Sequence, residues 1–153
     1  MPIRSKSSNI INNHYMKSKV LSIAIIITTI VIAVFCAISG PESIILHWNL
    51  WGEAESYGSK TLILILPVIS LIVFLVTVNQ EKHDYDTSLL SEQSRKNKNP
   101  KAIRDVTPIL LLLILYITAC SARMLSMTPI VPSSLIIIAI ILFIYKSRKS
   151  IKR

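Results

Sequence analysis

Charged residues are scarce in this sequence and absent from long stretches of it. Asp, Glu, Lys and Arg make up 16% of the 153 residues, against about 25% in an average soluble domain. Hydrophobic residues make up 52%, and the mean hydropathy is +0.57. The hydrophobic residues gather in four blocks with the charges between them, whereas a soluble core mixes the two kinds at a short period. This segregation excludes an ordinary soluble domain.

Cysteine is also scarce. Cys36 and Cys120 both fall inside apolar blocks, and the sequence has no Cys-x-x-Cys pair. Cysteine spacing therefore points to no redox or metal chemistry. The two thiols are expected near the same end of their helices, where a disulfide is conceivable, but packing as two free thiols is favoured.

The four apolar blocks are predicted to be membrane-spanning helices. As a helix, residues 20–39 cover about 30 Å, which is the thickness of the hydrocarbon core. The other blocks are residues 61–78, 106–122 and 130–145. Strands are not expected, because an open strand cannot satisfy its backbone in lipid. The predicted fold class is an all-α integral membrane protein with four transmembrane helices.

Ionisable side chains are missing from all four blocks. Pumps and ion-coupled carriers usually hold such groups at membrane depth, so a single-chain transporter is not expected. The hydroxyl residues of the blocks are expected to bond to their own helix or to a neighbouring one. Pro67 lies within the second block and removes a backbone hydrogen bond, which predicts a helix kink there.

Lysine and arginine predict the orientation of the chain. Residues 1–19, 79–105 and 146–153 carry 15 of the 17 Lys and Arg residues, and Lys60 and Arg123 are the other two. The positive-inside rule then places both termini and the middle loop in the cytoplasm. The predicted location is the cell (plasma) membrane, crossed several times. Topology and attraction to anionic lipid account for the basic charge, so no nucleic-acid partner is expected.

These boundaries divide the chain into five parts. The second part is a two-span domain with an outer loop, and the fourth is a two-span helical hairpin. The linker between them is predicted to be a solvated connector, with at most a short helix near residues 86–95. The parts are the cytoplasmic N-terminal segment 1–19, the two-span domain 20–78, the linker 79–105, the helical hairpin 106–145 and the basic tail 146–153.

The first outer loop, residues 40–60, contains both tryptophans of the chain. Trp48 and Trp51 suit a membrane interface, together with the apolar residues 44–46. Gly52 suits a turn back toward the second block. Interfacial anchoring accounts poorly for His47, which has carboxylates nearby in the sequence.

Two roles are open for the polar residues of this loop. They either hold its shape or form a recognition surface for an extracellular peptide. A metal site is a weaker alternative, because one histidine with carboxylates is a thin ligand set for zinc. No catalytic triad is expected, since His14 and His83 are predicted on the opposite side of the membrane from His47.

The order of residues in this region resembles a known bacterial family, domain of unknown function 1648 (DUF1648), which forms the N-terminal part of SdpI-like immunity proteins. The resemblance covers about residues 20–78. The family's second proline is Ile45 here, and its proline before the acid is Ala54. No motif is recognised in residues 106–145. The residues that carry the resemblance are Pro41, His47, Trp48, Asn49, Gly52, Glu55, Lys60 and Pro67.

The resemblance implies immunity to, or sensing of, a secreted toxic peptide through residues 40–60. We expect a small bacterial membrane protein that is not an enzyme and needs no cofactor or metal. A cytoplasmic regulator or a larger membrane protein is a conceivable partner, and an oligomer stays open. One alternative is an accessory subunit that packs against a larger transporter or enzyme. Another is a membrane-bound enzyme that depends on His47.

Overall fold

The computed structural model describes residues 4–90 and 100–151, with side chains described for residues 16–79 and 106–145. This part of the chain is mostly helical and also contains one two-stranded antiparallel sheet. The helices are α1 (Arg4–Ser39), α2 (Ile65–Leu90), α3 (Pro100–Ser121) and α4 (Ile130–Ile151), and the strands are β1 (Ser43–Trp48) and β2 (Ala54–Ser59).

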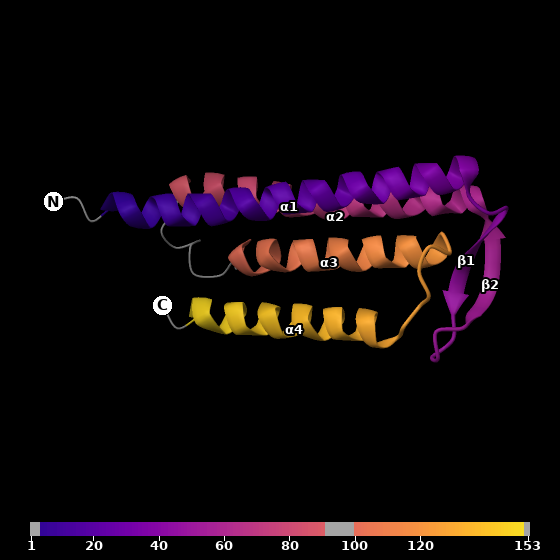
Figure 1. The fold of residues 1–153 in the computed structure, drawn as a ribbon. Coiled ribbons are helices and arrows are strands. Elements are labelled where there is room, and N and C mark those ends of the chain that lie inside the picture. Colours follow the sequence, from indigo (N-terminus) through magenta and orange to yellow (C-terminus); the bar gives the residue numbers. More distant parts are fainter. Residues whose placement is uncertain (1–3, 91–99, 152–153) are drawn as a thin grey trace.

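The four helices run alternately in opposite directions (Figure 1). The start of α1, the end of α2, the start of α3 and the end of α4 lie at one end of the bundle. The two strands and the connection between α3 and α4 lie at the other end. Because the number of alternating helices is even, the start of α1 and the end of α4 lie at the same end of the bundle.

Two helices are long and apolar enough to cross a membrane. They cover Met16–Ser39 and Lys60–Asn79, each with a mean hydropathy of 2.9. Val106–Ser121 and Ile130–Tyr145 are shorter apolar helices. Only 33% and 22% of the two longer windows are buried inside the structure, so most of their apolar side chains face outward. A large exposed apolar surface is typical of association with a membrane.

Small and hydroxyl-bearing residues make part of the contacts between the helices, beside a cluster of larger apolar residues such as Ile25, Ile26 and Leu111. α3 packs against each of the other three helices, and Thr118 and Cys120 on α3 are fully buried, as are Thr29 and Ala33 on α1. Such residues let helix backbones approach closely. The hydroxyls of Thr29 and Thr118 donate back to carbonyls one turn earlier, at 2.8 Å each, as expected from the sequence. Cys120 and the likewise buried Cys36 are free thiols.

Pro67 lies close to the start of α2. A 3₁₀ turn, η1 (Lys60–Leu64), precedes α2, so Pro67 lies in the first turn of α2. The missing N–H costs little there, and the chain changes from a 3₁₀ turn to an α-helix just before Pro67. Pro108 lies inside α3, because that helix begins earlier than the apolar block does.

Two helices extend into the segment predicted as a linker. α2 continues to Leu90 and α3 begins at Pro100. The short helix expected near residues 86–95 is therefore, over residues 86–90, the end of α2. Residues 91–95 lie outside the described part of the chain.

Candidate functional site at the β-hairpin

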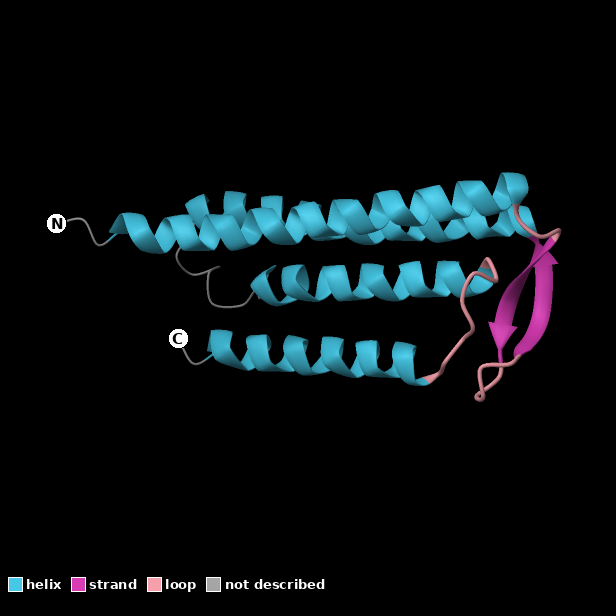
Figure 2. Ribbon diagram, viewed as in Figure 1, coloured by secondary structure: helices cyan, strands magenta, loops and turns pink. Residues whose placement is uncertain are grey.

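The loop between α1 and α2 is a β-hairpin that lies across the end of the helix bundle (Figure 2). β1 and β2 are antiparallel, with Ser43 opposite Ser59 and Trp48 opposite Ala54. This hairpin corrects the all-α prediction. Its apolar anchor is Ile44, which is 2% exposed and packs into a buried cluster at the end of the bundle. Burial of this one side chain fixes which face of β1 turns toward the helices.

The strand pairing is irregular around His47. The register shifts between Ile45 and His47, and again between His47 and Trp48, as in a β-bulge, which re-aims the side chains near it. The His47 Nε2 atom lies 3.2 Å from Glu55 Oε2, and these side chains are 69% and 56% exposed. An ion pair this exposed stabilises a fold little, so both groups remain available to a ligand.

Asn49 builds the hairpin turn. Its Oδ1 atom accepts hydrogen bonds from the backbone N–H groups of Trp51 and Glu53, each at 2.9 Å. Its Nδ2 atom donates to Glu53 Oε2 at 2.8 Å. The backbone closes the same turn, because the Asn49 N–H donates to the Glu53 carbonyl oxygen at 2.9 Å. An asparagine side chain that bonds to the backbone just ahead of it is a common way to form a turn. Asn49 is therefore a scaffold residue.

Gly52 packs the turn against the connection between α3 and α4. Its φ angle is +85°, in the region that favours glycine. A Cβ atom at this position would collide with the carbonyl oxygen of Met127 and approach Pro129 Cδ to 3.1 Å. Two separate constraints therefore require glycine at the tip.

The base of the hairpin is tied to the end of α1. The Lys60 Nζ atom donates to the carbonyl oxygen of Ile38 at 3.3 Å, and the Gly40 N–H donates to that of Cys36 at 2.9 Å. Carbonyls in the last helical turn lack partners within the helix and favour a nearby cation. Pro41 follows directly and is exposed; proline is common just after a helix end. Lys60 and Pro41 therefore define where α1 stops and β1 begins.

Residues outside the sequence motif also hold the hairpin. Arg123 donates from Nη2 to Ser43 Oγ at 3.0 Å, and its guanidinium lies over the Tyr57 ring. On the same connection, the Thr128 N–H donates to the Tyr116 hydroxyl at 3.0 Å. Sequence reasoning counted Arg123 as a charge but did not assign it a contact. The available signal was that Arg123 and Lys60 are the two basic residues outside the three basic segments of the sequence.

The tip of the hairpin is apolar and exposed. Leu50 is 90% exposed and Trp51 is 82% exposed, whereas Trp48 is half-buried. The sequence predicts a membrane interface for Trp51, whereas no pattern in it singles out Leu50. Together with His47 and Glu55, these two residues form the exposed part of the candidate site.

A metal centre would have few ligands here. The side chains described between residues 16–79 and 106–145 include no group of three or more His, Cys, Asp or Glu that could hold an ion. The His47–Glu55 pair is too small a set for zinc, which usually takes three or four protein ligands.

A mostly helical protein with two helices apolar enough to cross a membrane and a docked β-hairpin is typical of a membrane-associated protein. A search of protein families identifies part of it: residues 24–71 match the family described as Domain of unknown function (DUF1648). The match confirms the resemblance seen in the sequence and spans the apolar part of α1, the hairpin and the start of α2. No curated protein and no solved structure matches the chain.

Proposed function

We propose that this protein is a bacterial multi-pass membrane protein that senses, or gives immunity to, a secreted toxic peptide. The chain would cross the plasma membrane four times, with both termini in the cytoplasm and the β-hairpin outside. The hairpin would be the contact surface for the peptide. The proposal assigns no catalytic step and no cofactor.

Charge and geometry together support this placement. The start of α1, the end of α2, the start of α3 and the end of α4 lie at the end of the bundle opposite the hairpin, and the sequence segments that contain these helix ends carry 15 of the 17 Lys and Arg residues. The two cations at the hairpin end, Lys60 and Arg123, both contact other parts of the protein. Such an asymmetry is the usual mark of a cytoplasmic and an external side.

The observation that carries the functional proposal is the rigid exposure of Leu50 and Trp51. Both side chains are almost fully exposed, yet Asn49 and Gly52 fix the turn that bears them. A preformed apolar and aromatic anchor binds a partner without a large ordering cost. The hairpin also lies across the bundle end, where a peptide approaching the membrane surface would meet it. His47 and Glu55 supply polar groups that could orient the peptide.

A protection assay tests the proposal. Wild type, Trp51→Ala and His47→Ala would be expressed at equal membrane levels in a host that is sensitive to the native strain's spent medium. We expect wild type to restore survival and Trp51→Ala to lose most of it. Ile130→Ala is the matched control, because Ile130 is 80% exposed at the same end of the bundle but belongs to α4. It should protect as well as wild type does.

Two results would contradict the proposal. Absence of protection by wild type would remove the immunity role, and co-purification with a stoichiometric larger membrane protein would then favour an accessory subunit. Equal protection by wild type and both hairpin variants would show that the hairpin is only a scaffold.

A further inference from the structure

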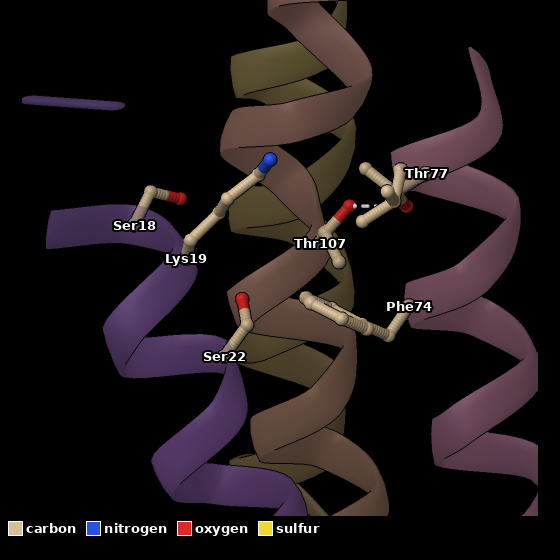
Figure 3. A pocket seen from close by; sticks show the side chains of 7 residues that line it. Ser18, Lys19, Ser22, Phe74, Thr77 and Thr107 are labelled. Carbon is tan, nitrogen blue, oxygen red and sulfur yellow. Dashed lines mark hydrogen bonds between the residues drawn. The ribbon is translucent and has the colours of Figure 1, made fainter. Parts of the chain in front are cut away.

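A narrow cleft opens between α1, α2 and α3 at the end of the bundle opposite the hairpin (Figure 3). Its volume is about 230 Å³, which includes space open to solvent. The cleft lies outside the family segment, residues 24–71. The residues that line it include Ser18, Lys19, Ser22, Phe74, Thr77 and Thr107.

Ser22 is a buried hydroxyl without a partner in this cleft. Its side chain is 3% exposed, and it makes no hydrogen bond within the described part of the chain. Its oxygen points into the space between α1 and α3 (Figure 3). Thr77 differs, since its hydroxyl bonds to the Val73 carbonyl and to the Thr107 hydroxyl, at 2.9 Å each. Buried polar groups are nearly always satisfied, by protein, water or ligand, so Ser22 indicates an oxygen-bearing occupant.

Lys19 gives the mouth of the cleft a positive charge. It extends from α1 toward Thr107, above Ser22 (Figure 3). Lys19 already has a polar interaction in the structure, but an ammonium group has three N–H donors and can bind a second acceptor. The lining contains no carboxylate. Lys19 and Ser22 therefore present two donors, and the one charged side chain of the lining is a cation, which suits an oxyanion.

We propose that this cleft binds the phosphate group of an anionic lipid, with one unesterified oxygen between Lys19 and Ser22. The inference rests on the membrane placement proposed above and not on the immunity role. The apolar window of α1 begins at Met16, so Lys19 and Ser22 lie within two turns of that end, near headgroup depth. Basic pockets between helices on the cytoplasmic side commonly take anionic headgroups.

The test uses the full chain, purified in a neutral detergent. The probes are dioleoyl phosphatidylglycerol, dioleoyl phosphatidylcholine and inorganic phosphate, each added in steps. The measurements are the shift of the thermal unfolding midpoint and the number of lipids retained in native mass spectrometry. We expect phosphatidylglycerol to raise the midpoint most and one molecule to be retained per chain. Loss of a hydrogen bond to a charged group should weaken this binding about tenfold in Ser22→Ala, and Lys19→Gln should weaken it at least as much.

Lys17→Gln is the matched control. Lys17 is exposed, lies two residues before Lys19 and does not line the cleft. It loses the same charge at the same end of the bundle but leaves the cleft intact, so it should bind phosphatidylglycerol as wild type does. Ser22→Ala should unfold at no lower temperature than wild type without lipid, since it removes an unpaired buried hydroxyl. This second measurement separates lost binding from lost folding.

Three results would overturn the inference. Equal responses of wild type and Ser22→Ala to phosphatidylglycerol would mean that the cleft holds only water. Equal weakening by Lys17→Gln and Lys19→Gln would mean general attraction to the charged end. A response to inorganic phosphate but not to the lipid would identify a soluble ligand. These measurements in detergent do not depend on orientation or immunity, so the failure of either proposal is distinguishable from the failure of this one.

Discussion

The guanidinium carbon of Arg123 lies 5.1 Å from the centre of the Tyr57 ring. This contact joins the connection between α3 and α4 to the second strand of the hairpin. Arg123 itself adopts a φ of 59°, which is uncommon for a residue with a side chain. The connection between α3 and α4, which lies outside the family match, therefore supports the hairpin, and this contact is one of the links between them.

We expect Arg123→Gln and Tyr57→Leu to loosen the hairpin by the same route. A cation–π contact at an exposed site contributes about 0.5–1 kcal/mol, and the double variant should be less destabilised than the sum of the single variants by about that amount. Amide hydrogen exchange in β2 is the measurement. Tyr57→Phe is the control because it keeps the ring, and it should behave nearly as wild type. Additive effects of the two single variants would show that the contact contributes nothing.

Asn49→Ala should open the hairpin turn. The substitution removes the side-chain bonds to the N–H groups of Trp51 and Glu53, and losing bonds of this kind costs about 1–2 kcal/mol. Exchange of these two amides should accelerate about tenfold or more, since 1.4 kcal/mol corresponds to a factor of ten. Glu53→Ala tests the side-chain contact alone and should have the smaller effect. If Asn49→Ala left both amides protected, the backbone alone would hold the turn.

Gly52→Ala should be the most disruptive single change at the tip. Forcing a side chain into a positive φ costs on the order of 1–3 kcal/mol, and the added methyl would also displace the Met127 carbonyl. Gly58→Ala is the matched control. A Cβ atom there would meet mainly the ends of the flexible Leu46 and Leu62 side chains, so a milder effect is expected. The thermal unfolding midpoints of both variants in detergent provide the comparison, and an equal loss would contradict the role assigned to φ at Gly52.

The helices could be predicted from the sequence because composition alone specifies them. An apolar run without ionisable residues predicts a helix whatever surrounds it, and the end of α3 at Ser121 and the start of α4 at Ile130 agree with the predicted blocks within a residue. Helix ends that lie in polar sequence were harder to predict. α2 runs on to Leu90 through polar sequence, where hydropathy gives no signal and helical propensity decides.

The hairpin could be predicted only in part. Gly52 was predicted to lie in a turn, and it does. The strands were missed because residues 54–59, Ala-Glu-Ser-Tyr-Gly-Ser, have little apolar alternation and weak strand preference. Their pairing depends on Ile44, whose burial against α1 and η1 is a tertiary contact. The Arg123–Tyr57 contact joins residues 66 positions apart in the sequence, so no local pattern could have shown it.

Cysteine labelling in intact cells should reveal the orientation of the bundle. Ser56 is exposed on β2, so Ser56→Cys should react with a membrane-impermeant maleimide if the hairpin is outside. Ser94 belongs to the linker, residues 79–105, which is rich in basic residues. Ser94→Cys should therefore not react until the cells are opened. Both variants are made after Cys36 and Cys120 are replaced by alanine. These native thiols are buried, and their removal leaves one reactive site per chain.

The comparison is informative because the two positions predict opposite results under one treatment. A permeant maleimide should label both variants equally, which controls for expression and for local reactivity. Labelling of Ser94→Cys alone in intact cells would reverse the orientation, and would place Leu50 and Trp51 in the cytoplasm, out of reach of a secreted peptide. Labelling of both positions from outside would mean that α2 does not cross the membrane between them, and the four-span arrangement would be wrong. Labelling of Ser56→Cys alone is the expected result, because the basic residues resist transfer across the membrane and hold their end of the bundle in the cytoplasm.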